Sequence, residues 1–250
     1  MAPPARTVRV MRCAIMQPTY MPWAGFLNLM AEVDLFIYLD DAQYERATWQ
    51  NRNRVLVAGQ PSWLTVPVLR DFLGAPIHQV RIDDQRLWRR KHAMLLQQAY
   101  ARHEFATNMR EAVDVLGDMA LARLATLNIA ILDRLRDRLG IATPTLRSSE
   151  LGIDGVRTDR LIAILAHMGA TEYVTPPGAL EYLRKDDFVS RAPQRLLVHD
   201  FHPTPYPQRG AASFVSHLSI LDVVAHLGWQ GASRYIHPSA PCVRELQEQP

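Results

Sequence analysis

The sequence predicts an α/β fold with a mixed, partly parallel sheet, flanking helices and a helical middle section. Short apolar runs of strand length alternate with segments whose apolar residues recur every three or four positions. Hydrophobic residues make up 48% of the 250 residues and charged residues 21%, as is typical of globular proteins. We expect a flexible segment at 1–12, one α/β domain at 13–229 and a tail at 230–250.

The first predicted unit is a strand, a loop, a helix and a second strand. Val8–Ile15 and Leu35–Leu39 are apolar runs, and Ala24–Ala31 carries apolar residues at helical spacing. A short helix between two strands favours a parallel pair, which places the loop Met16–Trp23 at the carboxyl end of the sheet. Ligands bind at that edge in open α/β folds, so polar residues there are functional candidates.

The next segment predicts a hairpin followed by long helices. Arg54–Ala58 and Trp63–Pro67 flank the turn signal Gly59-Gln60-Pro61, which favours an antiparallel hairpin and a mixed sheet. Helical spacing then dominates residues 86–100 and 106–139.

The last third of the domain predicts a second β/α layer. Glycines end two apolar helical patterns there, and a proline-rich stretch lies between the predicted strands. The expected elements are a helix at 159–168 ended by Gly169, strands at 173–175 and 196–199, an extended stretch at 203–207, and a helix at 219–227 ended by Gly228.

The composition limits the lysine chemistry and the kinds of ligand that we expect. The formal charge of +3 comes almost wholly from arginine, because Lys91 and Lys185 are the only lysines, and neither lies in a phosphate-binding glycine loop. No run of five or six basic residues marks a nucleic-acid tract, so the mild basicity fits an anionic small molecule or a tRNA. Oligomeric state stays open.

Cysteine usage and hydropathy bear on location. Cys13 and Cys242 have no zinc-site spacing, which favours a reduced, cytoplasmic protein without a bound metal. No stretch of eighteen apolar residues appears, and we therefore expect no membrane span.

The loop after the first strand is the most unusual stretch. Pro18 and Pro22 stiffen it, and stiffness lowers the entropic cost of presenting Gln17 and Tyr20 to a ligand. Trp23 ends the loop and is either a ligand contact or a core aromatic.

A second polar segment follows the second strand. Its amides can donate and accept hydrogen bonds, and Arg52 can hold a carboxylate or phosphate in bidentate fashion. The candidate ligand contacts are Gln43, Tyr44, Trp49, Asn51, Arg52 and Asn53.

Three side chains are candidates for proton transfer. Asp40 and Asp41 follow a strand, so one of them is expected over the carboxyl edge as a general base, unless they only stabilise a turn. His92 could face the site from its helix or lie on the surface. Tyr206 and Gln208, in a proline-rich stretch, could line one wall or form a strap.

The ordered blocks of this chain resemble the WbqC-like protein family. The block Ala14–Phe26, which contains Gln17-Pro18-Thr19-Tyr20, carries the resemblance first. It continues through Asp40–Tyr44, Trp49–Asn53, Trp63–Val68, Trp88–His92, Gly178–Leu183, Tyr206–Gln208 and Ser219–Asp222.

This resemblance implies a catalytic domain that transfers an aminoacyl or acyl group, with glycyl transfer suggested. The product would be an amide on an amino group of a sugar or small molecule in bacterial O-antigen or natural-product biosynthesis. An activated acyl donor or an aminoacyl-tRNA would supply the group, and Gly178 would join the binding residues. The family motif usually has histidine before Gln17, where this chain has Met16.

Two other hypotheses remain open. The order of strand, loop and helix resembles the opening of nucleotidyl-transferase and class I synthetase folds, which would imply an ATP-dependent nucleotidyl-transferase-like enzyme or amide ligase that uses ATP and magnesium. A noncatalytic binding protein of a biosynthetic complex is the third hypothesis.

Overall fold

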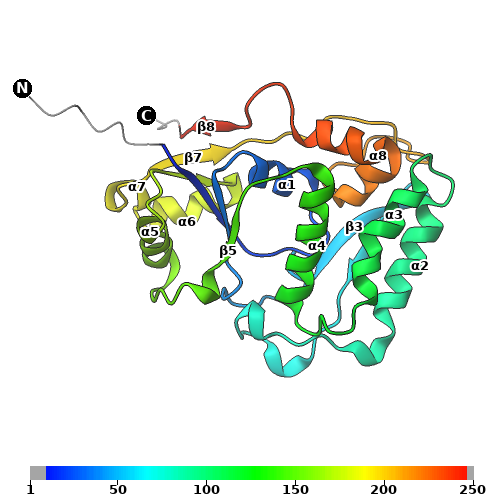
Figure 1. The fold of residues 1–250 in the computed structure, drawn as a ribbon, viewed down its shortest axis with the longest axis horizontal. Helices are drawn as coiled ribbons and strands as arrows, with labels where there is room; N and C mark the ends of the chain where they lie inside the picture. The colour runs from blue at the N-terminus through cyan, green and yellow to red at the C-terminus, as the bar shows by residue number, and fades with distance from the viewer. Residues whose placement is uncertain (1–9, 247–250) are drawn as a thin grey trace, which may run out of the picture.

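The computed structural model describes residues 10–246, and its centre is a six-stranded sheet in the order β5-β2-β1-β6-β7-β8 (Figure 1). Every neighbouring pair is parallel except β7 and β8, which are antiparallel. The predicted α/β fold with a mixed sheet is therefore confirmed. The strands are β1 Arg12–Met16, β2 Leu35–Tyr38, β5 Thr145–Arg147, β6 Glu172–Thr175, β7 Arg195–His199 and β8 Val243–Glu245.

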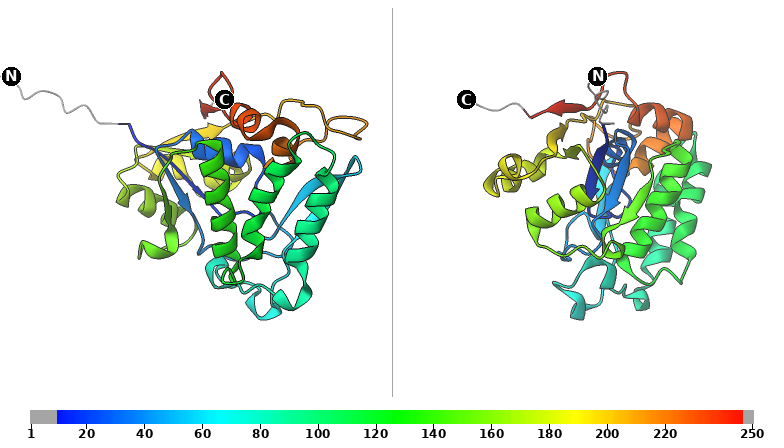
Figure 2. Two further views of the ribbon diagram at one scale, coloured as in Figure 1. Left: turned by 45° about the vertical axis from the view of Figure 1, so that its right-hand side comes forward. Right: turned by 60° about the vertical axis from the view of Figure 1, so that its left-hand side comes forward.

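Helices cover both faces of the sheet (Figure 2). One layer consists of α1 Ala24–Ala31, α2 Trp88–Tyr100, α3 Ala106–Val113, α4 Leu124–Leu139 and α8 Ile220–Ile236. The other consists of α5 Arg157–His167, α6 Leu180–Lys185 and α7 Phe188–Arg191. Single 3-10 turns connect them: η1 Arg70–Phe72, η2 Ile77–Gln79, η3 Asp84–Arg86, η4 Asp114–Gly117, η5 Ser148–Glu150 and η6 Pro177–Ala179.

The apolar run from Cys13 to Met16 in β1 follows from the helices on both faces of the sheet. Successive side chains of a strand point to opposite faces of the sheet. Cys13 and Ile15 pack into the layer of α5 to α7, whereas Ala14 packs into the layer of α1 and α8. A strand covered on both faces has no polar side to show.

The predicted hairpin exists but is not part of the main sheet. β3 Arg52–Val57 and β4 Gln60–Thr65 pair antiparallel as a sheet of two strands. Ala58 and Gly59 both have positive φ, 48° and 78°, as a tight two-residue hairpin turn requires. The prediction that this hairpin makes the main sheet mixed is wrong, because β8 does so.

The helical middle section is confirmed, with a break that the periodicity did not indicate. Residues 106–139, expected as one helical pattern, form α3, η4 and α4. The strand β5, at the edge of the sheet beside β2, was not predicted. With three residues it is too short to show an alternating pattern.

The C-terminal prediction needs correction. Gly228 does leave the helical conformation, with φ 67° and ψ 176°, and an added Cβ would come within 2.8 Å of the Phe105 ring. The chain resumes its helix beyond it, however, and ends α8 at Ile236. β8 then pairs with β7, so 230–246 is integral structure and not a tail.

At the other end, most of the predicted flexible segment, residues 1–9, lies outside the described residues, and Arg12 begins β1.

Candidate functional site

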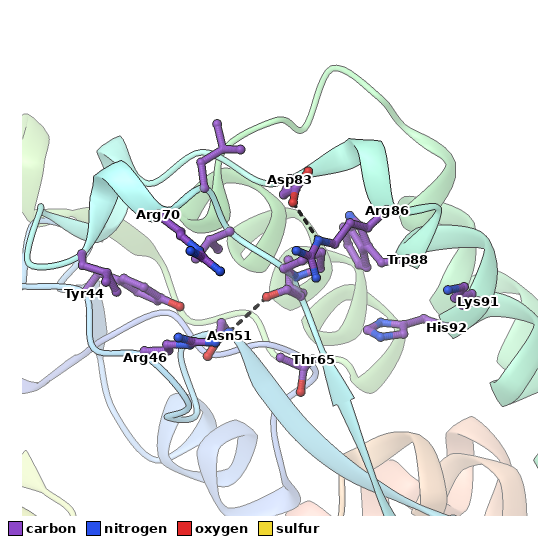
Figure 3. Close-up of a pocket in the computed structure, with 15 residues that line it drawn as sticks. Tyr44, Arg46, Asn51, Thr65, Arg70, Asp83, Arg86, Trp88, Lys91 and His92 are labelled. Atoms are coloured by element: carbon purple, nitrogen blue, oxygen red, sulfur yellow. Dashed lines mark hydrogen bonds and ion pairs between the residues drawn. The ribbon is translucent and has the colours of Figure 1, made fainter.

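A cavity of about 610 Å³ lies between the loop after β2, the β3–β4 hairpin and the first turns of α2 (Figure 3). Tyr44, Arg46 and Arg70 lie together on one side in this view, and Trp88 and His92 lie on the other. Residues from four segments line it: Tyr44, Arg46 and Asn51; Thr65, Val66, Pro67, Val68, Leu69, Arg70 and Leu73; Asp83 and Arg86; Trp88, Lys91 and His92.

Two buried polar atoms at this cavity lack partners. Tyr44 is 2% exposed and Asn51 is 3% exposed. Neither the Tyr44 hydroxyl nor Asn51 Oδ1 has a hydrogen-bond partner within residues 10–246. Buried polar groups are rarely left unsatisfied, because desolvation costs about 1–3 kcal/mol each. A hydroxyl and an amide oxygen in a cavity wall are therefore suited to a polar ligand.

The cavity is strongly cationic. Arg46, Arg70, Arg86 and Lys91 line it, whereas Asp83 is the one carboxylate among the described residues that line it. Asp83 Oδ2 accepts a hydrogen bond from Arg86 Nε at 2.9 Å, so this pair is internally compensated. The other three cations form no ion pair with a carboxylate in the described part of the chain. Their field favours an anionic ligand.

His92 lines the cavity with a defined partner. Its Nδ1 lies 2.9 Å from the hydroxyl of Tyr20, which is fully buried. Within the described residues the Tyr20 hydroxyl has no other partner, so its proton points to Nδ1 and the ring proton sits on Nε2. Burial lowers the pKa of His92 to about 4. At neutral pH the ring is therefore an uncharged donor.

The proline loop and the polar segment meet in the structure. Tyr20 N–H donates to the Trp49 carbonyl at 3.0 Å, and Gln50 Nε2 donates to Gln17 Oε1 at 2.8 Å. Asn53 Nδ2 donates to the Met21 carbonyl at 2.8 Å. The segments are joined directly, and the cavity opens beside this joint.

Comparison with known proteins agrees with the ordered blocks of the sequence. A model of the WbqC-like protein family matches residues 17–234, which is most of the chain. The chain belongs to the WbqC-like protein family. An uncharacterized protein of Mycobacterium tuberculosis strain H37Rv, Rv1507c, is 31% identical over 222 residues, covering 87% of this chain and 94% of that protein. No solved structure matches the chain.

Two of the candidate amides of this WbqC-like chain, Asn51 and Asn53, donate to backbone carbonyls, and Asn51 also lines the cavity. Asn53 is 1% exposed, and Asn51 Nδ2 donates to the Val66 carbonyl at 3.0 Å. Gln17 is partly buried and bonded to Gln50, and Gln43 is exposed; neither lines the cavity. Of the predicted contacts, Tyr44, Asn51 and His92 line it, and Tyr20 reaches it through His92.

Asp40 and Asp41 lie away from the cavity lining, in a network of their own. Asp40 is 1% exposed, and its carboxylate accepts from Ser149 N–H at 3.0 Å and from the Ser149 hydroxyl at 2.8 Å. Asp41 accepts from the Ser148 hydroxyl at 2.6 Å and pairs with Arg160. Their oxygens tie the end of β2 to η5, and the carboxylate at the cavity is Asp83.

Trp23 covers the first turn of α1. An added Cβ on Gly25 would lie 2.2 Å from the Trp23 ring, which also contacts the ring of His217 at 4.7 Å between centroids. The helix start is thus occupied by an aromatic side chain. A phosphate at this helix terminus, which the ATP-dependent hypothesis requires, would have to displace it.

Trp49 and Arg52 lie on the hairpin side of the molecule. Trp49 is 47% exposed, and its ring lies 5.7 Å from that of Trp63. The Arg52 guanidinium lies 4.1 Å above the Trp63 ring. None of the three lines the cavity.

The remaining candidates, Tyr206, Gln208 and Gly178, lie elsewhere. The Tyr206 hydroxyl and Gln208 Nε2 both donate to Asp222 Oδ2, at 2.6 and 3.1 Å, and Asp222 is fully buried. They act as a strap over α8, the alternative that the sequence had left open. Gly178 is exposed in η6 and is not among the cavity residues.

Sequence reasoning missed the cations of the site. Arg46, Arg70, Arg86 and Lys91 are single charges in separate segments, and an isolated charge in a sequence usually indicates a solvated surface position. Their only sequence signal is proximity to the blocks Asp40–Tyr44, Trp63–Val68 and Trp88–His92.

Two further properties apply to the described residues, 10–246. They contain no group of three or more His, Cys, Asp or Glu side chains placed to hold a metal ion. None of their helices is both long enough and apolar enough to cross a membrane.

Proposed function

We propose that this WbqC-like protein is an acyl- or aminoacyl-transferase that forms an amide on an amino group of a sugar or small molecule. The observation that carries the proposal is the cavity, where three cations without an ion-pair partner among residues 10–246 lie beside an uncharged, donating histidine. Activated acyl groups usually travel on anionic carriers, and Arg46, Arg70 and Lys91 would hold such a carrier. Family membership supports the proposal without specifying the reaction.

The chemistry assigned to each residue follows from its atoms. The amine nitrogen attacks the acyl carbonyl carbon, a C–N bond forms, and the bond from that carbon to the carrier oxygen or sulfur breaks. His92 Nε2–H would donate to the developing oxyanion, where one well-placed donor contributes about 3–4 kcal/mol. Asp83 would accept the proton that the amine loses, and that proton would leave with the carrier.

The first test compares small-molecule metabolites by mass spectrometry in cells with and without the gene. Complementation with wild type should restore an acylated amine, and His92→Phe should reduce it about 100-fold or more. Because His92→Phe orphans the Tyr20 hydroxyl, Arg70→Ala provides a second variant that leaves the buried pair intact. His167→Phe, an exposed histidine on α5, is the matched control.

Unchanged metabolites after gene loss would overturn the proposal. So would full restoration by both His92→Phe and Arg70→Ala. If His167→Phe lowers the amount of acylated amine as much as His92→Phe does, the loss comes from reduced stability and not from catalysis.

A further inference from the structure

A pair of exposed tryptophans lies at the β3–β4 hairpin, and neither of them lines the cavity. Trp49 and Trp63 are 47% and 45% exposed, with ring centroids 5.7 Å apart and planes at 39°. Large aromatic side chains normally bury most of their surface, so two exposed neighbours call for a ligand.

Two arginines lie against one of these rings, that of Trp63. The guanidinium carbons of Arg52 and Arg54 lie 4.1 and 5.7 Å from the centre of the Trp63 ring. The Nε atoms of both arginines are buried and have no hydrogen-bond acceptor within residues 10–246. Neither arginine forms an ion pair with a described carboxylate. Both charges are therefore uncompensated beside an aromatic surface.

This surface runs into the cavity. Arg52 pairs with Thr65 and Arg54 pairs with Trp63 across the two strands, and directly opposed residues share one face of a hairpin. Thr65 is also a cavity residue. The outer face of the hairpin and the cavity thus form one continuous strip of aromatic rings and positive charges.

From this strip we infer that the carrier of the acyl group is the single-stranded 3′ end of an RNA. Stacking on exposed rings requires bases whose faces are open, as in single strands, and duplex bases have no open face. Cations on both the hairpin and in the cavity match successive phosphates better than a single phosphate group. The strip we mean is Trp49, Arg52, Arg54, Trp63 and Thr65.

The inference names the acyl carrier of the proposed function. It rests on that function in one point, that the RNA end carries an acyl ester. The amine would attack the ester carbonyl carbon, the C–N bond would form as the C–O bond to the ribose breaks, and the amine proton would end on the ribose oxygen. The RNA would leave with a free hydroxyl, and no oxidant or reductant is needed.

Fluorescence anisotropy tests the binding without any chemistry. The probe is a 5′-labelled single-stranded RNA of about eight nucleotides that carries no acyl group. Its length lies within the range that one single-strand binding site covers. Wild type should bind it, and Trp63→Ala should weaken binding about 5- to 150-fold, whereas Trp63→Phe should retain most of the affinity because a stacking ring remains.

The arginines are tested through salt. Removing one phosphate contact should lower the slope of log affinity against log salt by about 0.7, which is the expectation for Arg54→Ala. Arg134→Ala removes the same charge from an exposed position on α4 and should leave both affinity and slope unchanged. A duplex of the same sequence, ADP and coenzyme A serve as competitors.

The inference is overturned if the RNA does not bind, or if Trp63→Ala and Arg134→Ala have equal effects. It is also overturned if the duplex, ADP or coenzyme A competes as well as the single strand. Failure here leaves the proposed function standing with a different carrier. RNA binding in a protein whose gene changes no acylated metabolite would instead remove the transferase and retain the strip.

Discussion

At the scale of single residues, buried polar side chains are held by specific partners. His92 contacts the Tyr20 hydroxyl, and His199 Nε2 lies 2.5 Å from Asn28 Oδ1. Burial lowers the pKa of each of these histidines to about 4. In the unfolded chain both would titrate near the ordinary value of about 6.5.

These shifts predict a loss of stability in mild acid. As pH falls below about 6.5, the two histidines become protonated in the unfolded chain. In the folded chain they stay neutral until about pH 4. The free energy of unfolding should therefore fall across this window, by on the order of 2–3 kcal/mol for each histidine. Urea unfolding at a series of pH values between 7 and about 4 measures it.

His199→Asn should flatten that dependence, and His167→Asn should not, because His167 is exposed. The lowered pKa of Asp84, whose carboxylate is bonded to Arg89 and Trp88, affects stability only below its ordinary value of 3.8. A wild-type protein equally stable at pH 7 and at about pH 4.5 would contradict the buried, neutral assignment.

At the scale of elements, α4 packs against the sheet and also holds two loops by hydrogen bonds from Asn128. Asn128, fully buried on this helix, donates through Nδ2 to the Pro18 carbonyl at 2.9 Å and the Gln50 carbonyl at 2.7 Å. One side chain thereby joins the proline loop to the polar segment. The rigidity that the prolines were expected to supply depends partly on this helix.

We predict that Asn128→Leu destabilises the protein by about 2–4 kcal/mol. It removes two hydrogen bonds and leaves two buried carbonyl groups without a donor, and each such group costs about 1–3 kcal/mol. Chemical unfolding measures the loss, with Arg134→Ala on the exposed side of the same helix as control. A change below about 0.5 kcal/mol, the range of surface substitutions, would mean that the loops are held by other contacts.

At the scale of the whole molecule, the sheet depends on its last strand. β8 covers the edge of β7 by pairing from Leu197 to His199, at the far end of the sheet from β5 (Figure 1). An uncovered edge presents unpaired backbone groups that favour association between chains.

Truncation after His237 should therefore produce soluble aggregates or higher oligomers, detectable by size-exclusion chromatography with light scattering. Truncation after Leu246 keeps β8 and serves as the matched control. If both truncated chains behave like the full-length protein, the edge of β7 tolerates exposure and β8 is dispensable.

The elements with strong periodicity were predictable, and the weak ones were not. The helix α4 lies in a segment predicted to be helical, and its buried residues Leu124, Leu127, Ile131, Leu135 and Leu139 recur every three or four positions. β5 and β8 have three residues each, too few for a pattern, and their pairing partners lie far away in the chain. Gly228 was expected to end a helix, but a glycine can also interrupt one.

The candidate site was predictable only in part, because the same type of side chain can bind a ligand or hold the backbone. Tyr44, Asn51 and His92 were expected at a site and line the cavity. Asn53 was expected with them, but an amide serves equally well to bind a ligand or to bond a backbone carbonyl, and here it does the latter. Composition and spacing do not distinguish these uses.

The sequence by itself determined the α/β class, the first β-loop-α-β unit and the family of this protein, because periodicity and ordered motifs are local properties of the chain. Only the tertiary structure decided which charges face a common cavity. Arg46, Arg70 and Lys91 come from three segments, and their joint field arises from distances that folding alone sets. The same applies to the Tyr20–His92 pair, which joins residues 72 positions apart.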